Sequence, residues 1–337
     1  MIFSQPHSRR FLSLLTLVLV IFVASRGQSQ LYSADLSLLE PDSTLNRVRV
    51  KTAMGISGAV FVSSGIGLYR TWYSQFDQSP FHLFDDSREW LQMDKAGHVF
   101  TTYFQSEMCY KVAHWTGMSK RGSILYGAAC GFVLQGAVEV FDGYSDKWGF
   151  SVSDLAANTV GMAAFAVQQA VWDEQRIRFK ISSRFSRDYP DAPSLVGSDG
   201  STYVNAVAQR DKDLFGDNGP QRFIKDYNSQ TYWMSINLNS FGLDIVPSWL
   251  SIALGYGAEN LLGGFENTWK IDGVELSYPV QRSRQFYLSP DINWAGIHFD
   301  SHLMTTLGTL LNAYKWPTPA VEYDTERGWA FHLLLIH

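Results

Sequence analysis

The sequence DKAGH at residues 94–98, together with EVFDG at 139–143 and SVSDLAAN at 151–158, places charged and amide side chains in otherwise apolar helical sequence. Charged groups in such surroundings are costly unless they meet one another. We therefore interpret the three segments as parts of a helical bundle in which these side chains come together.

The spacing of the segments predicts how they meet. Residues 94–110 and 122–141 are expected to be helices, and the connection at 115–120 is rich in turn and capping residues. A short connection makes two helices antiparallel neighbours, so residues equally far from it lie at the same level. By this count His98 is level with Glu139, and Cys109 is roughly level with Cys130.

A third helix is expected to begin near Asp154, after a second turn at 143–150. Residues four apart share a helical face, and several polar residues repeat at that spacing. Gly127 and Gly131 precede Gln135 and Glu139 on one such ridge, which predicts a close approach of the neighbouring helix. The resulting polar layer is expected to contain Asp94, His98, Glu139, Asp142, Asp154 and Asn158.

These same motifs resemble a known family. Residues 94–98, the run at 139–145, and the run at 148–154 with Asn158 and Gly161 resemble the YfiM-type predicted periplasmic lipoproteins, whose activity is uncharacterised. The close resemblance covers about residues 93–171, and residues 225–233 look like a longer version of the family. More loosely, the pattern is similar to VanZ-like membrane proteins. A lipoprotein has a cysteine just after its signal segment, whereas this chain has none before Cys109.

The resemblance implies a helical fold and a place in the cell envelope, in the periplasm or outer membrane of a Gram-negative bacterium. It implies no reaction. The N-terminus is consistent with export, since Arg9 and Arg10 precede an apolar run at 11–23 that is followed by small residues. This arrangement predicts a signal peptide at 1–29, with an uncleaved anchor helix as the alternative.

The predicted fold class is mainly α. A bundle of about four helices is expected at 30–187, a linker or loop at 188–228, and a smaller α+β region at 229–337. In that last region alternation predicts strands at 232–238, near 286–288 and at 329–335, with short amphipathic helices at 249–262 and 302–314. So few strands favour a small antiparallel sheet over a closed barrel, which is the alternative.

The amino-acid composition limits the classes of binding partner. The net charge of −5 argues against nucleic acid, and 15% aromatic residues with 18% charged residues fit a protein that contacts a membrane interface. We therefore expect membrane lipid or envelope proteins as partners. Residues 52–69 contain no charge and suit a helix in lipid or in a core. The acidic turn at 85–89 is interpreted as solvated. The basic run at 176–187 is interpreted as a solvated helix end, with contact to anionic headgroups as the alternative.

Two main interpretations of the polar layer remain open, beside a role in transport or gating. The favoured one is structural or binding: Ser151 and Asp154 form a helix capping box, and Lys95 neutralises a neighbouring carboxylate. The candidate binding residues are Lys95, Gln135, Asp142, Asp154 and Asn158.

The alternative is a metal-assisted or acid–base hydrolase acting on an envelope lipid or phosphate substrate. In this interpretation His98 is the general base, oriented by Asp94 or Glu139. The candidate ligands of a divalent metal are His98, Glu139, Asp142 and Asp154. For Cys109 and Cys130, a disulfide and a pair of free thiols are both open.

Overall fold

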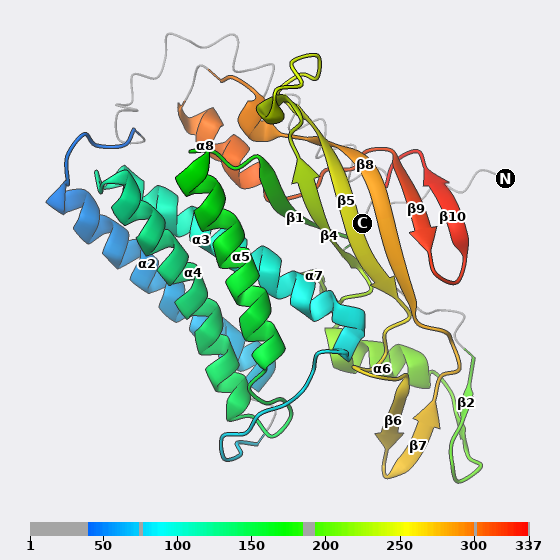
Figure 1. The fold of residues 1–337 in the computed structure, drawn as a ribbon. Coiled ribbons are helices and arrows are strands. Elements are labelled where there is room, and N and C mark those ends of the chain that lie inside the picture. Colours follow the sequence, from blue (N-terminus) through cyan, green and yellow to red (C-terminus); the bar gives the residue numbers. More distant parts are fainter. Residues whose placement is uncertain (1–39, 74–76, 185–192, 300–301, 336–337) are drawn as a thin grey trace, which may run out of the picture. The chain divides into compact units, whose positions relative to one another are not determined.

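Helices α3, α4 and α5 pack against one another and carry the polar segments (Figure 1). The computed structural model describes residues 40–73, 77–184, 193–299 and 302–335, so the predicted signal peptide lies outside the described residues. The elements of this N-terminal part are α2 (Arg47–Leu68), η2 (Tyr69–Tyr73), η3 (Glu89–Gln92), α3 (Met93–Trp115), α4 (Lys120–Gly143) and α5 (Val152–Val171).

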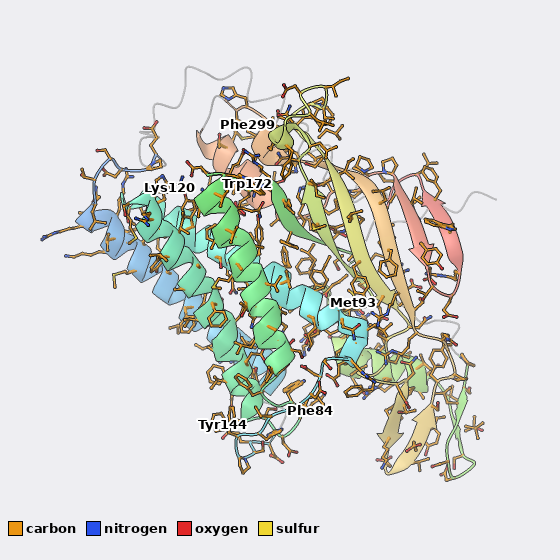
Figure 2. The ribbon with its side chains drawn as sticks, in the orientation of Figure 1. Phe84, Met93, Lys120, Tyr144, Trp172 and Phe299 are labelled. Atoms are coloured by element: carbon orange, nitrogen blue, oxygen red, sulfur yellow. The ribbon has the colours of Figure 1, made fainter. Side chains whose placement is uncertain are left out.

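Local capping explains where these helices begin. The Ser119 side chain accepts a hydrogen bond from the Gly122 backbone N–H, and the Ser151 side chain accepts one from that of Asp154. Short connections join α3 to α4 and α4 to α5, so each helix runs antiparallel to the one before it, as predicted. Figure 2 shows the outcome: Tyr144 and Phe84 lie near one end of the helices, and Lys120 and Trp172 lie near the other.

Glycine allows α4 to approach α3 closely. A Cβ at Gly131 would lie 2.2 Å from Ser106 Oγ and 2.9 Å from the Thr102 carbonyl oxygen. Where α5 approaches α3, a Cβ at Gly161 would lie 2.3 Å from the Val99 carbonyl oxygen. The predicted small-residue ridge is therefore confirmed, and it brings the polar side chains of the three helices within reach of one another.

Six strands of the described residues form one antiparallel sheet in the order β1-β4-β5-β8-β9-β10. They are β1 (Ile177–Ser183), β4 (Gln230–Ile236), β5 (Leu250–Glu259), β8 (Ser283–Ile292), β9 (Ala320–Asp324) and β10 (Gly328–His332). The sheet meets the bundle at β1, where the ring of Phe179 contacts that of Tyr103 on α3 at 5.3 Å between centroids. A helical bundle followed by an antiparallel sheet with short helices was the predicted fold class, and it is confirmed.

Smaller elements complete the C-terminal part. Strands β2 (Leu195–Val196) and β3 (Thr202–Tyr203) pair with each other, as do β6 (Thr268–Ile271) and β7 (Val274–Ser277). The remaining elements are α6 (Ala206–Phe215), α7 (Gly219–Lys225), η4 (Asn239–Phe241), η5 (Trp294–Gly296) and α8 (His302–Leu311). The buried residues of this region include Val207 and Phe215 of α6, which pack in a cluster with Leu262 and Leu276.

The two faces of the sheet have an unusual polarity. One face of strands β5 and β8 is apolar and exposed. The strand pairing places on this face Ile252, Leu254, Phe286 and Leu288. The opposite face is buried and polar, and there Lys180 Nζ lies 2.6 Å from Asp291 Oδ2 with both side chains fully buried. Sheets of water-soluble proteins normally bury the apolar face and expose the polar one.

Several predictions about this region are corrected by the structure. The helix expected at 249–262 is instead strand β5, because the alternate residues Ala253 and Gly255 are small and leave room for the Trp233 ring. The segment 188–228, predicted as a linker or loop, contains α6 and α7. The helix expected at 302–314 is confirmed as α8, and the expected strands are confirmed as β4, β8 and β10.

The basic run at 176–187 is also not a solvated helix end. Residues 177–183 of the run form strand β1, where Arg178 and Lys180 have specific acidic partners. Arg178 Nη1 lies 2.9 Å from Glu107 Oε1, and Lys180 pairs with Asp291 on the polar face of the sheet. Arg178 therefore joins the sheet to α3, and Lys180 lies in a buried ion pair within the sheet.

Candidate functional site

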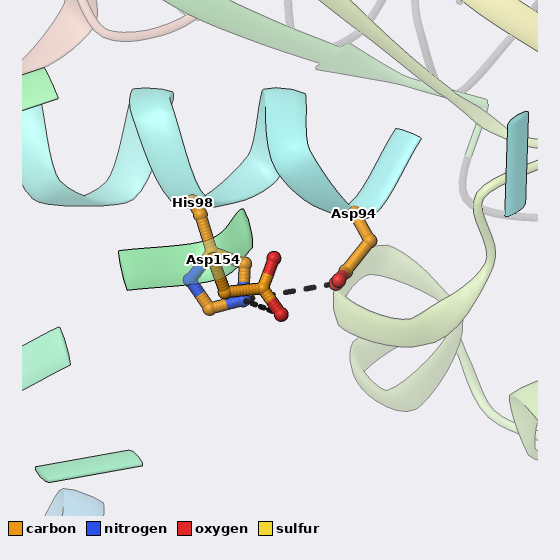
Figure 3. Close-up of side chains that lie close together, drawn as sticks. All are labelled: Asp94, His98 and Asp154. Atoms are coloured by element: carbon orange, nitrogen blue, oxygen red, sulfur yellow. Dashed lines mark ion pairs between the residues drawn. The ribbon is translucent and has the colours of Figure 1, made fainter. Parts of the chain in front are cut away.

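The predicted polar layer is present near the first turns of α3. His98 Nε2 lies 3.8 Å from Asp94 Oδ1, 3.7 Å from Glu139 Oε1 and 3.8 Å from Asp154 Oδ2. Figure 3 shows the Asp94, His98 and Asp154 side chains converging from α3 and α5. The level expected for His98 and Glu139 from the length of the helical hairpin is therefore confirmed.

The imidazole is held from its other nitrogen. His98 Nδ1 lies 3.0 Å from Asn158 Oδ1, and the Thr102 hydroxyl donates to the same oxygen at 2.9 Å. Asn158 and Thr102 are both fully buried. The predicted member Asn158 therefore orients His98 and does not face the cavity with a free amide oxygen.

Lys95 binds the acidic side chains on the other side of the cluster. Its Nζ lies 2.7 Å from Asp154 Oδ1, 2.9 Å from Asp86 Oδ1 and 3.1 Å from Asp94 Oδ2. Lys95 was predicted to neutralise one carboxylate, whereas its ammonium group contacts three. Such a bridge fixes α3, α5 and the preceding loop relative to one another, because each carboxylate belongs to a different segment or turn.

Asp86 was predicted to be solvated, and that prediction is wrong. Its side chain is buried and accepts hydrogen bonds from the hydroxyls of Ser151 and Ser153, at 2.6 and 2.7 Å. Those serines also open α5, so Asp86 connects the loop before α3 to the α5 N-terminus. The pair of hydroxyls at 151 and 153 was the available sequence signal for an acidic partner.

The capping box is only half formed. Ser151 caps α5 as predicted, but its own backbone N–H donates to Glu139 Oε2 at 3.3 Å and not to Asp154. The Asp154 carboxylate instead lies between Lys95 and His98. Asp154 thus does more than cap a helix, and Glu139 ties α4 to the start of α5.

Asp142 and Gln135 lie beside the cluster. Asp142 Oδ1 accepts a hydrogen bond from the Tyr73 hydroxyl at 2.6 Å, and Gln135 Nε2 donates to Gln105 Oε1 at 3.1 Å. Both side chains line the adjoining cavity. Asp142 is not among the acidic residues that lie within 4 Å of the imidazole, so it is less suited to share a metal ion with His98.

A cavity of about 290 Å³ adjoins the cluster. Its walls combine acidic and aromatic side chains from the helices with two tyrosines from the C-terminal part. The Tyr227 hydroxyl donates to Asp94 Oδ1 at 2.6 Å, and the Tyr232 hydroxyl lies over Gly97, where a Cβ would approach to 2.9 Å. Sequence reasoning did not assign these tyrosines to the site, although it singled out residues 225–233.

The electrostatics favour shared protons or a bound cation. Burial is the main cause that raises the pKa of Glu139 to about 7 and that of Asp142 to about 6. Burial, reinforced by Asp94, also raises the pKa of Asp154. For His98 burial lowers the pKa, but Asp94, Asp154 and Glu139 outweigh it and raise the pKa overall. The carboxylates therefore exceed the positive charges available to them.

One segment of the chain matches a family model. This segment contains α3, α4, almost all of α5, the buried polar layer and the loop before α3. Residues 82–170 match the family described as Predicted periplasmic lipoprotein (DUF2279). The match covers about a quarter of the chain and includes Asp86 and every predicted site residue, so the resemblance inferred from the motifs is confirmed for this segment. No curated protein and no solved structure matches the chain.

The two cysteines lie outside the polar layer. Cys109 and Cys130 carry free thiols whose sulfur atoms are 2.9 Å apart, between α3 and α4. Their predicted common level is confirmed, and no disulfide joins them in this structure.

Proposed function

We propose that the protein is an exported, membrane-associated envelope protein that uses its buried polar cluster as a binding site. The observation that carries the membrane association is α2. None of its described residues is buried, and no charged residue occurs at 52–69. A largely exposed apolar helix is stable only where lipid or another apolar surface covers its exposed side.

The N-terminal end of α2 supports contact with lipid. Arg47, Arg49 and Lys51 form the first turns, directly before the uncharged stretch. Basic residues beside an apolar helix are attracted to anionic headgroups, whereas the apolar residues favour acyl chains. The exposed Val60 and Phe61 lie in the middle of this stretch.

Neighbouring helices offer further apolar surface. Val133 and Phe141 of α4 and Val160 and Val167 of α5 are exposed. By length and composition α4 is the one helix among the described residues that could cross a membrane, a test that core helices also pass. The exposed apolar face of β5 and β8 adds a second surface of the same chemistry.

The membrane proposal is tested by vesicle flotation of the full chain and by its fractionation after export from a Gram-negative host. We expect the mature chain to begin near residue 30 and to float with vesicles containing anionic lipid. Val60→Asp places a charge in the middle of the exposed stretch, which costs about 2.5–3.5 kcal/mol at the centre of a bilayer. The floated fraction of that variant is expected to fall several-fold.

Val196→Asp is the matched control, because Val196 is also exposed but lies in β2, outside the bundle of α2–α5. This control should float like the unchanged protein. Equal flotation of both variants, or a chain that stays in the supernatant without any substitution, would contradict the proposal.

A hydrolase remains the second candidate, favoured by the Glu139 carboxyl. Its pKa of about 7, raised chiefly by burial, suits proton transfer near neutral pH, and it lies 3.7 Å from His98 Nε2. Hydrolysis of phosphodiester and ester lipids by the purified chain, lost in Glu139→Gln, would support this candidate. Absence of turnover with folded protein leaves binding as the role of the cluster.

A further inference from the structure

The imidazole of His98 faces three acidic oxygens without hydrogen-bonding to any of them. The distances from Nε2 to Asp94 Oδ1, Glu139 Oε1 and Asp154 Oδ2 are 3.7–3.8 Å. Direct N–H···O hydrogen bonds are about 2.7–3.2 Å long. The donor atoms of Asp94, His98 and Asp154 lie within 4.8 Å of one another around a common point, and Glu139 Oε1 lies beside them. These separations suit a shared ligand better than direct contact.

The contacts of Nδ1 fix which electron pair points to that centre. Asn158 Oδ1 already accepts a hydrogen bond from Thr102, so it accepts the Nδ1–H of His98 as well. A neutral imidazole protonated at Nδ1 presents the lone pair of Nε2 to the three carboxylates. A histidine held through its second nitrogen in this way is the usual arrangement of a metal ligand.

Glu139 supplies an independent indication. Its side chain is only 1% exposed, and Oε1 has no hydrogen-bond partner among the residues that the structure describes. Oε1 is aimed at His98 Nε2, while Oε2 accepts the Ser151 N–H. A buried oxygen without a donor is costly, and a cation at the common point would satisfy it.

The charges agree with this arrangement. The carboxylates of the cluster and its border outnumber its cations, which are Lys95 and, when its imidazole carries a second proton, His98. They are Asp86, Asp94, Glu139, Asp142 and Asp154. Lys95 is already within 3.1 Å of three of them. A doubly charged ion beside His98 would offset the remaining negative charge.

We propose that His98 Nε2 and the carboxylates of Asp94, Glu139 and Asp154 bind one first-row divalent metal ion, with Zn²⁺ as the best fit. Asp94, His98 and Asp154 each offer a donor atom within 4.8 Å of the others, and Glu139 Oε1 lies 3.7 Å from His98 Nε2. These side chains would move inwards around the ion to reach the distances of about 2.0–2.2 Å at which zinc binds histidine and carboxylates. A mixed nitrogen and oxygen donor set disfavours Mg²⁺ and Ca²⁺, which prefer oxygen alone.

This inference names the ligand of the binding site proposed above and rests on that role. Membrane association is measured by flotation, which does not depend on the metal, so the two proposals fail separately. The full chain is stripped with a chelator in detergent and titrated with Zn²⁺ alone by calorimetry and elemental analysis. We expect one ion per chain, a higher melting temperature on binding, and much weaker binding of Mg²⁺.

Substitutions identify the site. His98→Ala is expected to weaken Zn²⁺ binding by at least about 100-fold, and Glu139→Gln by about 10-fold or more. His114→Ala is the matched control, because this histidine lies near the other end of α3. The affinity of this variant for Zn²⁺ should equal that of the unchanged chain. Circular dichroism verifies that each variant is folded.

If His98→Ala does not fold, Glu139→Gln and X-ray absorption of the zinc-loaded protein decide the question. We expect an absorption spectrum with one imidazole and otherwise oxygen ligands. The proposal is overturned if the folded, unchanged chain binds no stoichiometric Zn²⁺, if His98→Ala or Glu139→Gln bind as the unchanged chain does, or if the spectrum lacks imidazole.

Discussion

His98 on α3 and Asn158 on α5 are joined by a 3.0 Å hydrogen bond between imidazole Nδ1 and amide Oδ1. The same amide oxygen accepts the Thr102 hydroxyl at 2.9 Å. One fully buried oxygen therefore connects two helices and sets the direction in which the imidazole faces the acidic cluster.

Replacing Asn158 by alanine should test this connection. Asn158→Ala leaves the His98 and Thr102 donors buried without their acceptor, and we expect a loss of about 1–3 kcal/mol in the free energy of unfolding. It should also weaken Zn²⁺ binding about 10–100-fold, because the histidine loses its orienting partner. Denaturant unfolding and calorimetry measure the two effects. Val160→Ala, on an exposed turn of α5, serves as control, and stability equal to that of the control would contradict the expected role.

Two glycines of α4 should respond oppositely to alanine. At Gly131 a Cβ meets Ser106 and Thr102 of α3, so Gly131→Ala is expected to cost about 1–3 kcal/mol through overpacking. At Gly136 a Cβ meets nothing within 4 Å, so Gly136→Ala should stabilise the helix by about 0.5–1 kcal/mol. Melting temperatures of the two variants make the comparison, and equal shifts would show that α3 and α4 are not in close contact.

Glu107 should make the protein sensitive to acid. It is buried beside Arg178 and Lys111, at 2.9 and 3.1 Å. Burial alone raises the pKa of Glu107, but these two cations outweigh it and lower the pKa to about 2. An unfolded glutamate has a pKa of about 4.3. Because the folded pKa is the lower one, the stabilisation is complete above that value and is lost as the pH falls from about 4.3 towards 2.

Glu107→Gln removes this titration. The difference in unfolding free energy between the unchanged chain and Glu107→Gln should be largest above about pH 5 and shrink as the pH falls. Thermal unfolding at a series of pH values follows it. A difference that grows towards low pH would have the wrong sign.

Removing one partner of the buried Lys180–Asp291 pair should destabilise the protein more than removing both. Lys180→Met leaves Asp291 buried without its cation, for which we expect a loss of about 3–5 kcal/mol. The double variant Lys180→Met, Asp291→Leu should recover most of that loss, since no charge then remains unpaired. Unfolding free energies of the two single variants and the double variant give the coupling. Purely additive losses would argue against a direct ion pair.

The thiols of Cys109 and Cys130 should cross-link when an oxidant is supplied. Their sulfur atoms are 2.9 Å apart, so little movement is needed to form a bond. With copper(II) phenanthroline as electron acceptor, each thiol gives up one proton and one electron and the chain loses about 2 Da. Mass spectrometry without reductant measures the loss. Cys130→Ser should not show it, and an unchanged mass after oxidation of the native chain would contradict the juxtaposition.

The polar layer could be predicted because its members follow simple rules of helix geometry. His98 and Glu139 are equally far from one turn, and Asp94 is four residues before His98, so their meeting required no tertiary information. Asp86 and Tyr227 were not predicted as members of the site, because helix geometry does not apply to them. Each reaches the cluster from a segment without periodicity, and only the folded chain places these residues beside Lys95 and Asp94.

The sheet was harder to predict because its polarity is inverted. Strand β5 buries Ser251, Ala253 and Gly255 and exposes Ile252 and Leu254, so its small residues obscure the alternation. The buried cations of β1 presented a similar difficulty. Arg178 and Lys180 looked like solvated charges because their partners, Glu107 and Asp291, lie 71 and more than 100 residues away in the sequence.

The Tyr227 hydroxyl reaches Asp94 from outside the segment 82–170. A fragment that ended at residue 170 would keep every charged member of the cluster but would lose this phenol and the neighbouring Tyr232 wall. Water would then enter from that side and weaken each electrostatic contact. Under the proposed binding role, ligand selectivity would be a joint property of the helical segment 82–170 and the C-terminal part, and affinities measured on the shorter fragment would not transfer to the whole protein.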